Sequence, residues 1–113
     1  MPRIEPVPGD WYSWHMTRDG LIARLRAEEA ALRRVGVAGL SLFGSAARGE
    51  DGAGSDIDVL VRFEPAGAVS LLDVVHVEHM LSDAVGRTVQ ITPEPVRRPR
   101  LAARIESERV RVF

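Results

Sequence analysis

The chain has 113 residues, the usual size of one domain, and 45% of them are hydrophobic, enough for one core but not for a separate substrate domain. Its formal net charge of −1 gives no reason to expect direct, nonspecific binding of nucleic acid. Disulfides and thiol chemistry are excluded because cysteine is absent, and no apolar run approaches the ~18 residues of a spanning helix, so a cytoplasmic protein without membrane contact is expected.

The first segment in chain order is a tail. Residues 1–16 carry three prolines within their first ten positions and are predicted to be extended. The aromatic residues Trp11, Tyr12 and Trp14 then cluster before the first helix. They either pack against the domain's own core or form a docking surface for a partner, since Trp and Tyr are favoured at interfaces.

A helix is predicted over residues 17–34, at the start of a domain that fills residues 17–113. The spacing of its apolar residues fits one buried stripe with charges around it. That stripe is expected to hold Leu21, Leu25 and Leu32.

An apolar strand is predicted to end at Phe43, directly before a Gly-Ser pair. Gly44 has no Cβ, so a phosphate can approach the backbone closely there. Ser45 places a hydroxyl in the first turn of a short helix, where free N–H groups bind anions readily. Arg48 can add a charge-assisted contact. These residues predict a site for the phosphates of a nucleotide.

The next predicted strand opens with two carboxylates, Asp56 and Asp58. Residues two apart in a strand point to the same face, so both side chains aim together. Two like charges this close raise each other's pKa unless a cation joins them. Magnesium takes oxygen ligands and is usually held by one or two carboxylates plus substrate phosphates. Asp56 and Asp58 are therefore predicted metal ligands.

A second helix is predicted over residues 70–85. Ser70 and Asp73 form a capping box at its start, and Gly86 is a C-terminal stop. Its buried stripe is expected to hold Leu71, Val74, Val77, Leu81 and Val85.

The C-terminal stretch is predicted to be a basic loop over residues 97–100, a short helix over 101–108 and an edge strand over 109–112. The arginines of that strand are expected to point outward and to blunt edge pairing. The basic loop either contacts RNA or an acidic partner, or is an ordinary solvated surface.

The joint spacing of the Gly-Ser pair and the two aspartates is more specific than either feature alone. The segment GSAARGEDGAGSDIDVLV resembles the polymerase-beta-like nucleotidyltransferases, and the minimal nucleotidyltransferases (MNT domains) in particular. The resemblance covers residues 37–113, about two thirds of the chain. It implies an α/β (α+β) fold with a small mixed central sheet flanked by helices, with ATP as nucleotide donor and Mg²⁺ as cofactor.

The resemblance also implies a partner. Small prokaryotic MNT proteins are commonly antitoxins of HEPN-domain ribonuclease toxins, and some transfer AMP from ATP to a tyrosine of the toxin. A HEPN toxin in a hetero-oligomer is therefore the expected partner.

One residue departs from the family pattern. Members usually carry a third carboxylate on the next strand, predicted here over residues 87–91, and Gln90 takes its place. Alternation along that strand points Gln90 toward the motif aspartates. An amide cannot accept a proton at neutral pH and is a weaker magnesium ligand than a carboxylate. Either the enzyme turns over slowly, or catalysis is lost and the protein neutralises its toxin by stoichiometric binding.

Overall fold

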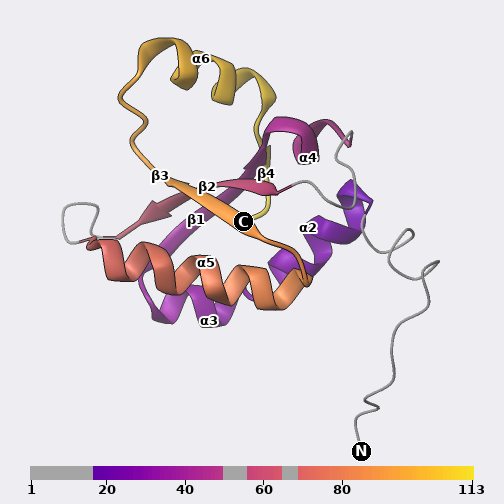
Figure 1. The fold of residues 1–113 in the computed structure, drawn as a ribbon, viewed down its shortest axis with the longest axis vertical. Helices are drawn as coiled ribbons and strands as arrows, with labels where there is room; N and C mark the ends of the chain where they lie inside the picture. The colour runs from indigo at the N-terminus through magenta and orange to yellow at the C-terminus, as the bar shows by residue number, and fades with distance from the viewer. Residues whose placement is uncertain (1–16, 50–55, 65–68) are drawn as a thin grey trace, which may run out of the picture.

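The chain folds as a four-stranded sheet with helices on both of its faces (Figure 1). A computed structural model describes residues 17–49, 56–64 and 69–113. The expected α/β architecture, a small mixed sheet flanked by helices, is confirmed. The predicted tail, with Trp11, Tyr12 and Trp14, lies outside the described residues, and the division at residue 17 stays a prediction. The elements are α2 (Arg18–Arg26), α3 (Glu29–Arg34), β1 (Val37–Phe43), α4 (Gly44–Arg48), β2 (Ile57–Phe63), α5 (Leu71–Val85), β3 (Val89–Pro93), α6 (Pro99–Glu108) and β4 (Val110–Arg111).

The strands lie in the order β3-β2-β1-β4. β1 is antiparallel to both β2 and β4, whereas β2 and β3 are parallel. A parallel pair needs a crossover connection, and α5 supplies it. In the strand register, Asp58 of β2 pairs with Phe43 of β1 on one side and with Gln90 of β3 on the other. The end of β1 and residues of β2 and β3 are therefore neighbours across the sheet.

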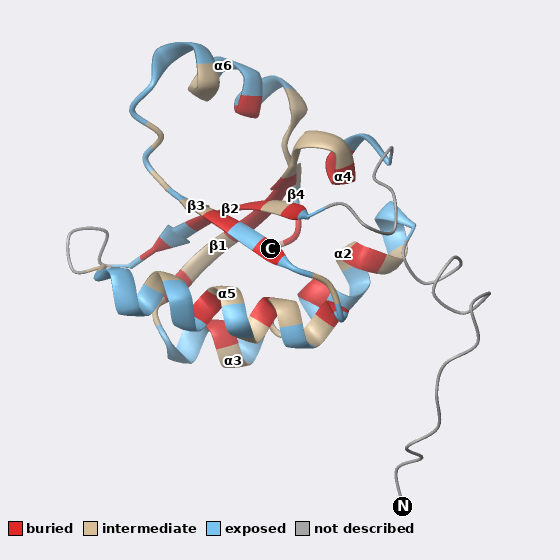
Figure 2. Cartoon of the chain, viewed as in Figure 1, coloured by how far each residue is buried: buried red, intermediate tan, exposed pale blue. Residues whose placement is uncertain are grey.

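One face of the sheet holds the main core. Along β2, Ile57, Val59 and Val61 are fully buried, as period-2 alternation predicts. Helices α2, α3 and α5 lie on this side of the sheet (Figures 1 and 2). Their buried residues in this core are Leu21, Leu25, Leu32, Val77, Leu81 and Val85.

The other face carries the intervening residues of β2, which are Asp58, Leu60 and Arg62. Leu60 is buried, and it lines a cavity of about 190 Å³ together with Ile105 of α6. Neither residue belongs to the main core cluster. Helix α6 therefore covers part of the face on which Asp58 lies.

The single helix predicted over residues 17–34 is wrong in one respect, because the helix breaks between α2 and α3. At the break the N–H of Glu28 donates to the carbonyl of Leu25, three residues back, instead of continuing the four-residue ladder. The two pieces then pack against different elements, α2 on α5 and α3 on β1. The break changes the direction of the chain while all three predicted leucines stay buried.

Helix α5 begins and ends as predicted. Ser70 accepts from the Asp73 N–H, the Asp73 carboxylate accepts from the Ser70 N–H, and Gly86 ends the helix at φ +70°. Leu71 was expected in the buried stripe but is 77% exposed. The first turn of α5 extends past the elements that bury its later turns, as the exposed end in Figure 2 shows.

Two C-terminal strands differ from expectation. β3 begins at Val89, not at residue 87, because Gly86 is left-handed and the Thr88 carbonyl is the first group to pair with β2, at the Ile57 N–H. β4 is only Val110–Arg111. Arg109 was expected to point outward but is half-buried over the sheet.

Among the described residues, no helix is long and apolar enough to cross a membrane.

Candidate active site

Gly44 and Asp58 meet at the junction of β1, α4 and β2. Gly44 has φ +71°, and a Cβ placed on it would lie 3.1 Å from the Asp58 carboxylate oxygen Oδ2. Glycine is needed twice over, because an L side chain is strained at this φ and would also press on the carboxylate. The chain turn after β1 thus holds the backbone of Gly44 directly against Asp58.

Asp56 and Gln90 form the other half of the site. Asp56 lies immediately before β2, and Gln90 lies on β3 in register with Asp58. The Gln90 amide nitrogen Nε2 donates to Asp56 Oδ2 at 2.7 Å. The expectation that Gln90 faces the motif aspartates is therefore confirmed, and its amide occupies one oxygen of Asp56.

The two carboxylates interact electrostatically. Partial burial raises the pKa of Asp58 above its ordinary value of 3.8, and the negative charge of Asp56 raises this pKa further. Ionisation of Asp58 is therefore less favourable than that of a free aspartate when no cation is present. A divalent ion beside both carboxylates would remove that repulsion.

The two carboxylates fit magnesium rather than a metal caged by protein alone. Among the described residues, no group of three or more His, Cys, Asp or Glu side chains could hold an ion. Two carboxylates with room for phosphate and water oxygens are the donor set that Mg²⁺ commonly takes with a nucleotide. Asp58 Oδ2 lies close to the Gly44 backbone. An ion held by the two carboxylates would therefore lie beside the turn at Gly44, where the phosphates of a nucleotide are predicted to bind.

Ser45 and Arg48 both lie on α4. Ser45 is half-buried in its first turn, next to Gly44. Because α4 has only five residues, little helix dipole accumulates, and any phosphate contact there would come from individual N–H and hydroxyl groups. Arg48 Nη1 lies 3.2 Å from Glu108 Oε1 on α6. Arg48 thus joins α4 to α6, and its predicted contact with phosphate stays a prediction.

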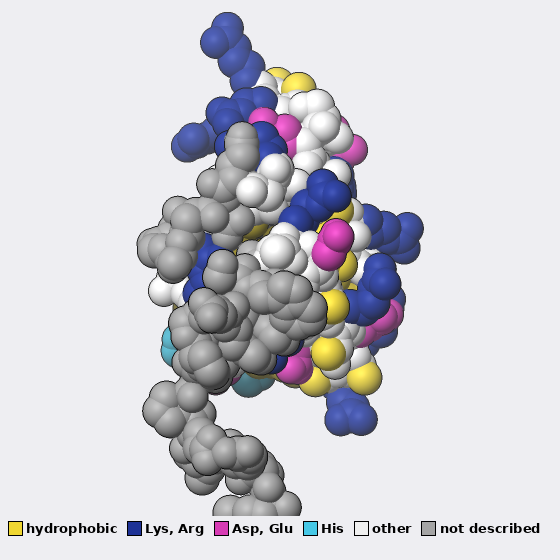
Figure 3. All heavy atoms as spheres, turned by 90° about the vertical axis from the view of Figure 1, so that its right-hand side faces the viewer, with side chains coloured by type: hydrophobic (Ala, Val, Ile, Leu, Met, Phe, Trp, Pro, Cys, Tyr) yellow, Lys and Arg dark blue, Asp and Glu magenta, His cyan; other side chains and the backbone are white. Residues whose placement is uncertain are grey.

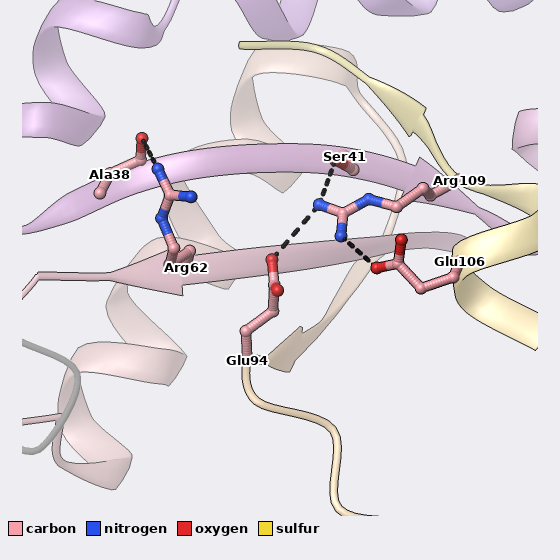
Figure 4. Close-up of polar contacts among 6 residues, drawn as sticks. All are labelled: Ala38, Ser41, Arg62, Glu94, Glu106 and Arg109. Carbon is pink, nitrogen blue, oxygen red and sulfur yellow. Dashed lines mark hydrogen bonds and ion pairs between the residues drawn. The ribbon is translucent and has the colours of Figure 1, made fainter. Parts of the chain in front are cut away.

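Sequence reasoning missed Arg109, which anchors α6 to the sheet (Figure 4). Its Nη2 donates to Ser41 Oγ at 2.9 Å and to Glu94 Oε1 at 3.3 Å, and its Nη1 donates to Glu106 Oε1 at 2.8 Å. Ser41 is 1% exposed, so this guanidinium satisfies a buried hydroxyl. The alternation of residues 109–112 predicted a strand with outward arginines. No sequence pattern near Arg109 predicted hydrogen bonds to Ser41 on β1 or to Glu94, which follows β3.

The comparison with protein families agrees with this geometry. A family model described as a nucleotidyltransferase domain matches residues 25–112, which include every element of the site. The chain belongs to the nucleotidyltransferase domain family.

Relatives of this nucleotidyltransferase domain cover most of its length. A predicted protein adenylyltransferase of Methanocaldococcus jannaschii is 40% identical over 82 residues, which is 73% of this chain and 86% of that protein. A solved structure of a predicted minimal nucleotidyltransferase is 35% identical with a TM-score of 0.72, over 85% of this chain and 96% of the other. These matches assign the chain to the minimal nucleotidyltransferases.

A more distant neighbour comes from a toxin–antitoxin complex. A chain of the tri-AMPylated Shewanella oneidensis HEPN toxin in complex with its MNT antitoxin matches with a TM-score of 0.56 and 16% identity, over 78% of this chain and 68% of that one. At this identity the likeness shows a shared fold alone.

Proposed function

We propose that this nucleotidyltransferase domain transfers AMP from ATP to a tyrosine hydroxyl of a HEPN ribonuclease toxin and so acts as its antitoxin. The relative from M. jannaschii is named for protein adenylylation, which supports AMP as the group transferred and a protein as its acceptor. A fold neighbour occurs with an AMPylated HEPN toxin, which supports the class of partner. The convergence of Gly44, Asp56 and Asp58 on one face of the sheet carries the proposal most directly.

The proposed roles follow from where each side chain lies. Asp56 and Asp58 would hold Mg²⁺, and the open backbone at Gly44 would admit the phosphates, with the Ser45 hydroxyl beside them. Gln90 would keep Asp56 oriented through the amide hydrogen bond. When bound, Mg²⁺ would neutralise charge that develops on the phosphate oxygens.

The proposed reaction is an in-line displacement at the α-phosphorus of ATP. A bond forms between the acceptor oxygen and the α-phosphorus, the bond to the bridging oxygen breaks, and pyrophosphate leaves with the electron pair. The hydroxyl proton must go to solvent or to the partner, because the Gln90 amide cannot accept it. Reactions of this class depend mostly on positioning and electrostatic stabilisation, so a missing general base slows transfer without abolishing it.

The decisive experiment is mass measurement of a HEPN-domain ribonuclease partner after incubation with this protein, ATP and Mg²⁺. An added AMP on the intact partner, absent with Asp58→Asn, supports the proposal. Neutralisation of the ribonuclease with no added mass would reject transfer as the mechanism.

The second candidate is neutralisation by stoichiometric binding, and Gln90 is the observation that favours it. The Gln90 amide lies in register with Asp58 and donates to one oxygen of Asp56, where the resemblance predicts a third carboxylate. In this case the ribonuclease would be inhibited one-to-one, without dependence on ATP.

The variant Gln90→Asp tests whether the missing acid limits the rate of transfer. If the missing acid limits the rate, restoring it should raise transfer by up to about 10²–10⁴-fold, the range typical of a general base. Initial rates of adduct formation measure this, with Gln90→Asn as the control that keeps an amide. An unchanged rate in Gln90→Asp would remove Gln90 from the place of the third carboxylate.

A further inference from the structure

The residues from 97 to 104 carry the most concentrated net positive charge of the described chain. Four of these eight residues are arginines, Arg97, Arg98, Arg100 and Arg104, and none is acidic. All four are exposed, and within the described residues none makes a hydrogen bond or ion pair through its side chain. We call these four residues the α6 arginine surface. Dark-blue side chains gather over α6 at the top of Figure 3.

The acidic residues nearest to this surface are already engaged. Glu94 and Glu106 pair with Arg109, and Glu108 pairs with Arg48. They fix the C-terminal end of α6 and leave the charge at its N-terminal end uncompensated.

This placement is unfavourable for the helix on its own. The first turn of α6 has no acidic residue and no side-chain cap, so cations lie at the positive end of the helix dipole. Arg100 and Arg104 are also like charges four residues apart on one helix, which repel each other. A negative surface docked here would turn both penalties into attractions.

The α6 arginine surface has a fixed relation to the candidate active site. Ile105 lines a cavity together with Leu60, which lies on the face of β2 that also carries Asp58. The Arg48–Glu108 ion pair joins α6 to α4, which begins at Gly44, and Arg109 ties the end of α6 to β1. Helix α6 is therefore tied to the elements that position the carboxylates, so a macromolecule docked on it is held in a fixed relation to the candidate active site.

The charge distribution favours an acidic protein over a nucleic acid. The other 105 residues hold 11 arginines and all 16 acidic residues, so their formal charge is −5. A nucleic acid needs a basic track along its backbone, whereas here the positive surface is confined to eight residues in an otherwise acidic chain. A local cluster of Asp and Glu on a protein matches such a surface.

We infer that the α6 arginine surface docks an acidic surface of the protein acceptor and so brings the acceptor hydroxyl to the carboxylates. This inference rests on the proposed function for the identity of the acceptor. The docking itself depends only on charge and can be measured without transfer.

The binding test compares two variants with equal loss of charge. Arg100→Gln/Arg104→Gln removes half of the α6 arginine surface, and Arg34→Gln/Arg111→Gln removes two exposed arginines elsewhere that have no partner among the described residues. The probes are a fluorescein-labelled oligoglutamate and a labelled oligouridylate of equal length, titrated by anisotropy at low and at physiological salt. Circular dichroism verifies that both variants are folded.

The inference predicts that the α6 variant binds oligoglutamate about fivefold more weakly or worse, while the control variant binds as the parent does. Equal weakening in both variants would overturn it, since net charge alone would then explain binding. Tighter binding of oligouridylate than of oligoglutamate would overturn it in favour of RNA, and so would no binding of oligoglutamate by the parent.

Transfer kinetics then separate this inference from the proposed function. With a HEPN acceptor, the α6 variant should raise KM for the acceptor and leave kcat and KM for ATP unchanged. Adduct formation with an unchanged KM for the acceptor would reject docking on α6 but keep the transferase. A complete lack of adduct in the parent protein would reject the transferase, and the oligoglutamate result would still decide whether α6 binds acidic chains.

Discussion

At the scale of single residues, the site depends on one close approach and one shared hydrogen bond. The missing side chain of Gly44 leaves room for the Asp58 carboxylate, and the amide of Gln90 holds Asp56. Among the described residues, no basic side chain forms an ion pair with Asp56 or Asp58. Removing one of these negative charges should therefore stabilise the protein without metal and weaken the binding of a cation.

Gly44→Ala should weaken binding of Mg²⁺ and ATP as well as stability. The added Cβ would be strained at φ +71° and would press on Asp58 Oδ2 at 3.1 Å. The left-handed conformation alone costs about 1–2 kcal/mol for an L residue. Gly86→Ala is the matched control, because Gly86 has φ +70° and an added Cβ meets no described atom within 4 Å. Urea unfolding should show destabilisation in both variants, larger in Gly44→Ala because only its Cβ presses on a neighbour, and ATP calorimetry should show weaker binding only in Gly44→Ala.

Asp58→Asn should stabilise the protein in the absence of metal. Burial and the charge of Asp56 raise the pKa of Asp58, so its ionised form opposes folding. We expect a gain below about 1 kcal/mol at neutral pH, because Asp58 is only partly buried and solvent screens the repulsion between the carboxylates. In the parent protein, Asp58 binds a proton more readily in the folded state than in the unfolded state. The stability of the parent therefore rises as pH falls through the raised pKa toward 3.8. Over the same range the stability advantage of Asp58→Asn shrinks. A gain independent of pH in urea unfolding would contradict this electrostatic origin.

At the scale of elements, α6 is held by less apolar packing than α5. Ile105 is its one fully buried residue, whereas α5 buries Val77, Leu81 and Val85. Polar contacts of Arg109 with β1, with Glu94 beyond β3 and with α6 itself replace the missing apolar area (Figure 4).

Arg109→Gln should loosen α6 while the rest of the sheet stays intact. The change leaves the buried Ser41 hydroxyl and two carboxylates without their shared donor, and hydrogen bonds to charged groups are worth about 1.5–3 kcal/mol each when formed. Hydrogen exchange should accelerate in α6 and β4 and remain slow in β2. Arg104→Gln, on the same helix but without side-chain partners among the described residues, serves as control. Uniform acceleration throughout the chain would mean that Arg109 supports the whole fold instead.

At the scale of the whole molecule, a bound ligand adds to a modest core. The chain is small and its sheet has four strands, so its free energy of unfolding is modest. The free energy of ligand binding should therefore change the stability measurably.

Mg²⁺ and ATP together should raise the unfolding temperature, and ATP with a chelator should not. The gain follows mass action and reaches about 2.7 kcal/mol at a ligand concentration 100 times Kd. Differential scanning fluorimetry at increasing ATP measures it, with Asp58→Asn as the variant expected to lose the response. A full response in the presence of chelator would exclude the metal from nucleotide binding.

The sequence by itself determined the local units of this protein and the type of its site. Alternation fixed which face of β2 is buried, the Ser70–Asp73 capping box and Gly86 fixed the ends of α5, and the spacing of Gly44, Ser45, Asp56 and Asp58 pointed to a nucleotidyltransferase. These features depend on residues close together in the chain, where covalent geometry limits the possible conformations.

Only the tertiary structure decided how distant segments meet. The hydrogen bond from Gln90 to Asp56 spans 34 residues and that from Arg109 to Ser41 spans 68, and no local pattern encodes either partner. The same holds for the break between α2 and α3, the exposure of Leu71 and the pairing of Arg48 with Glu108. Such contacts depend on the register of the strands and on where helices end against the sheet, which the packing of the whole core sets.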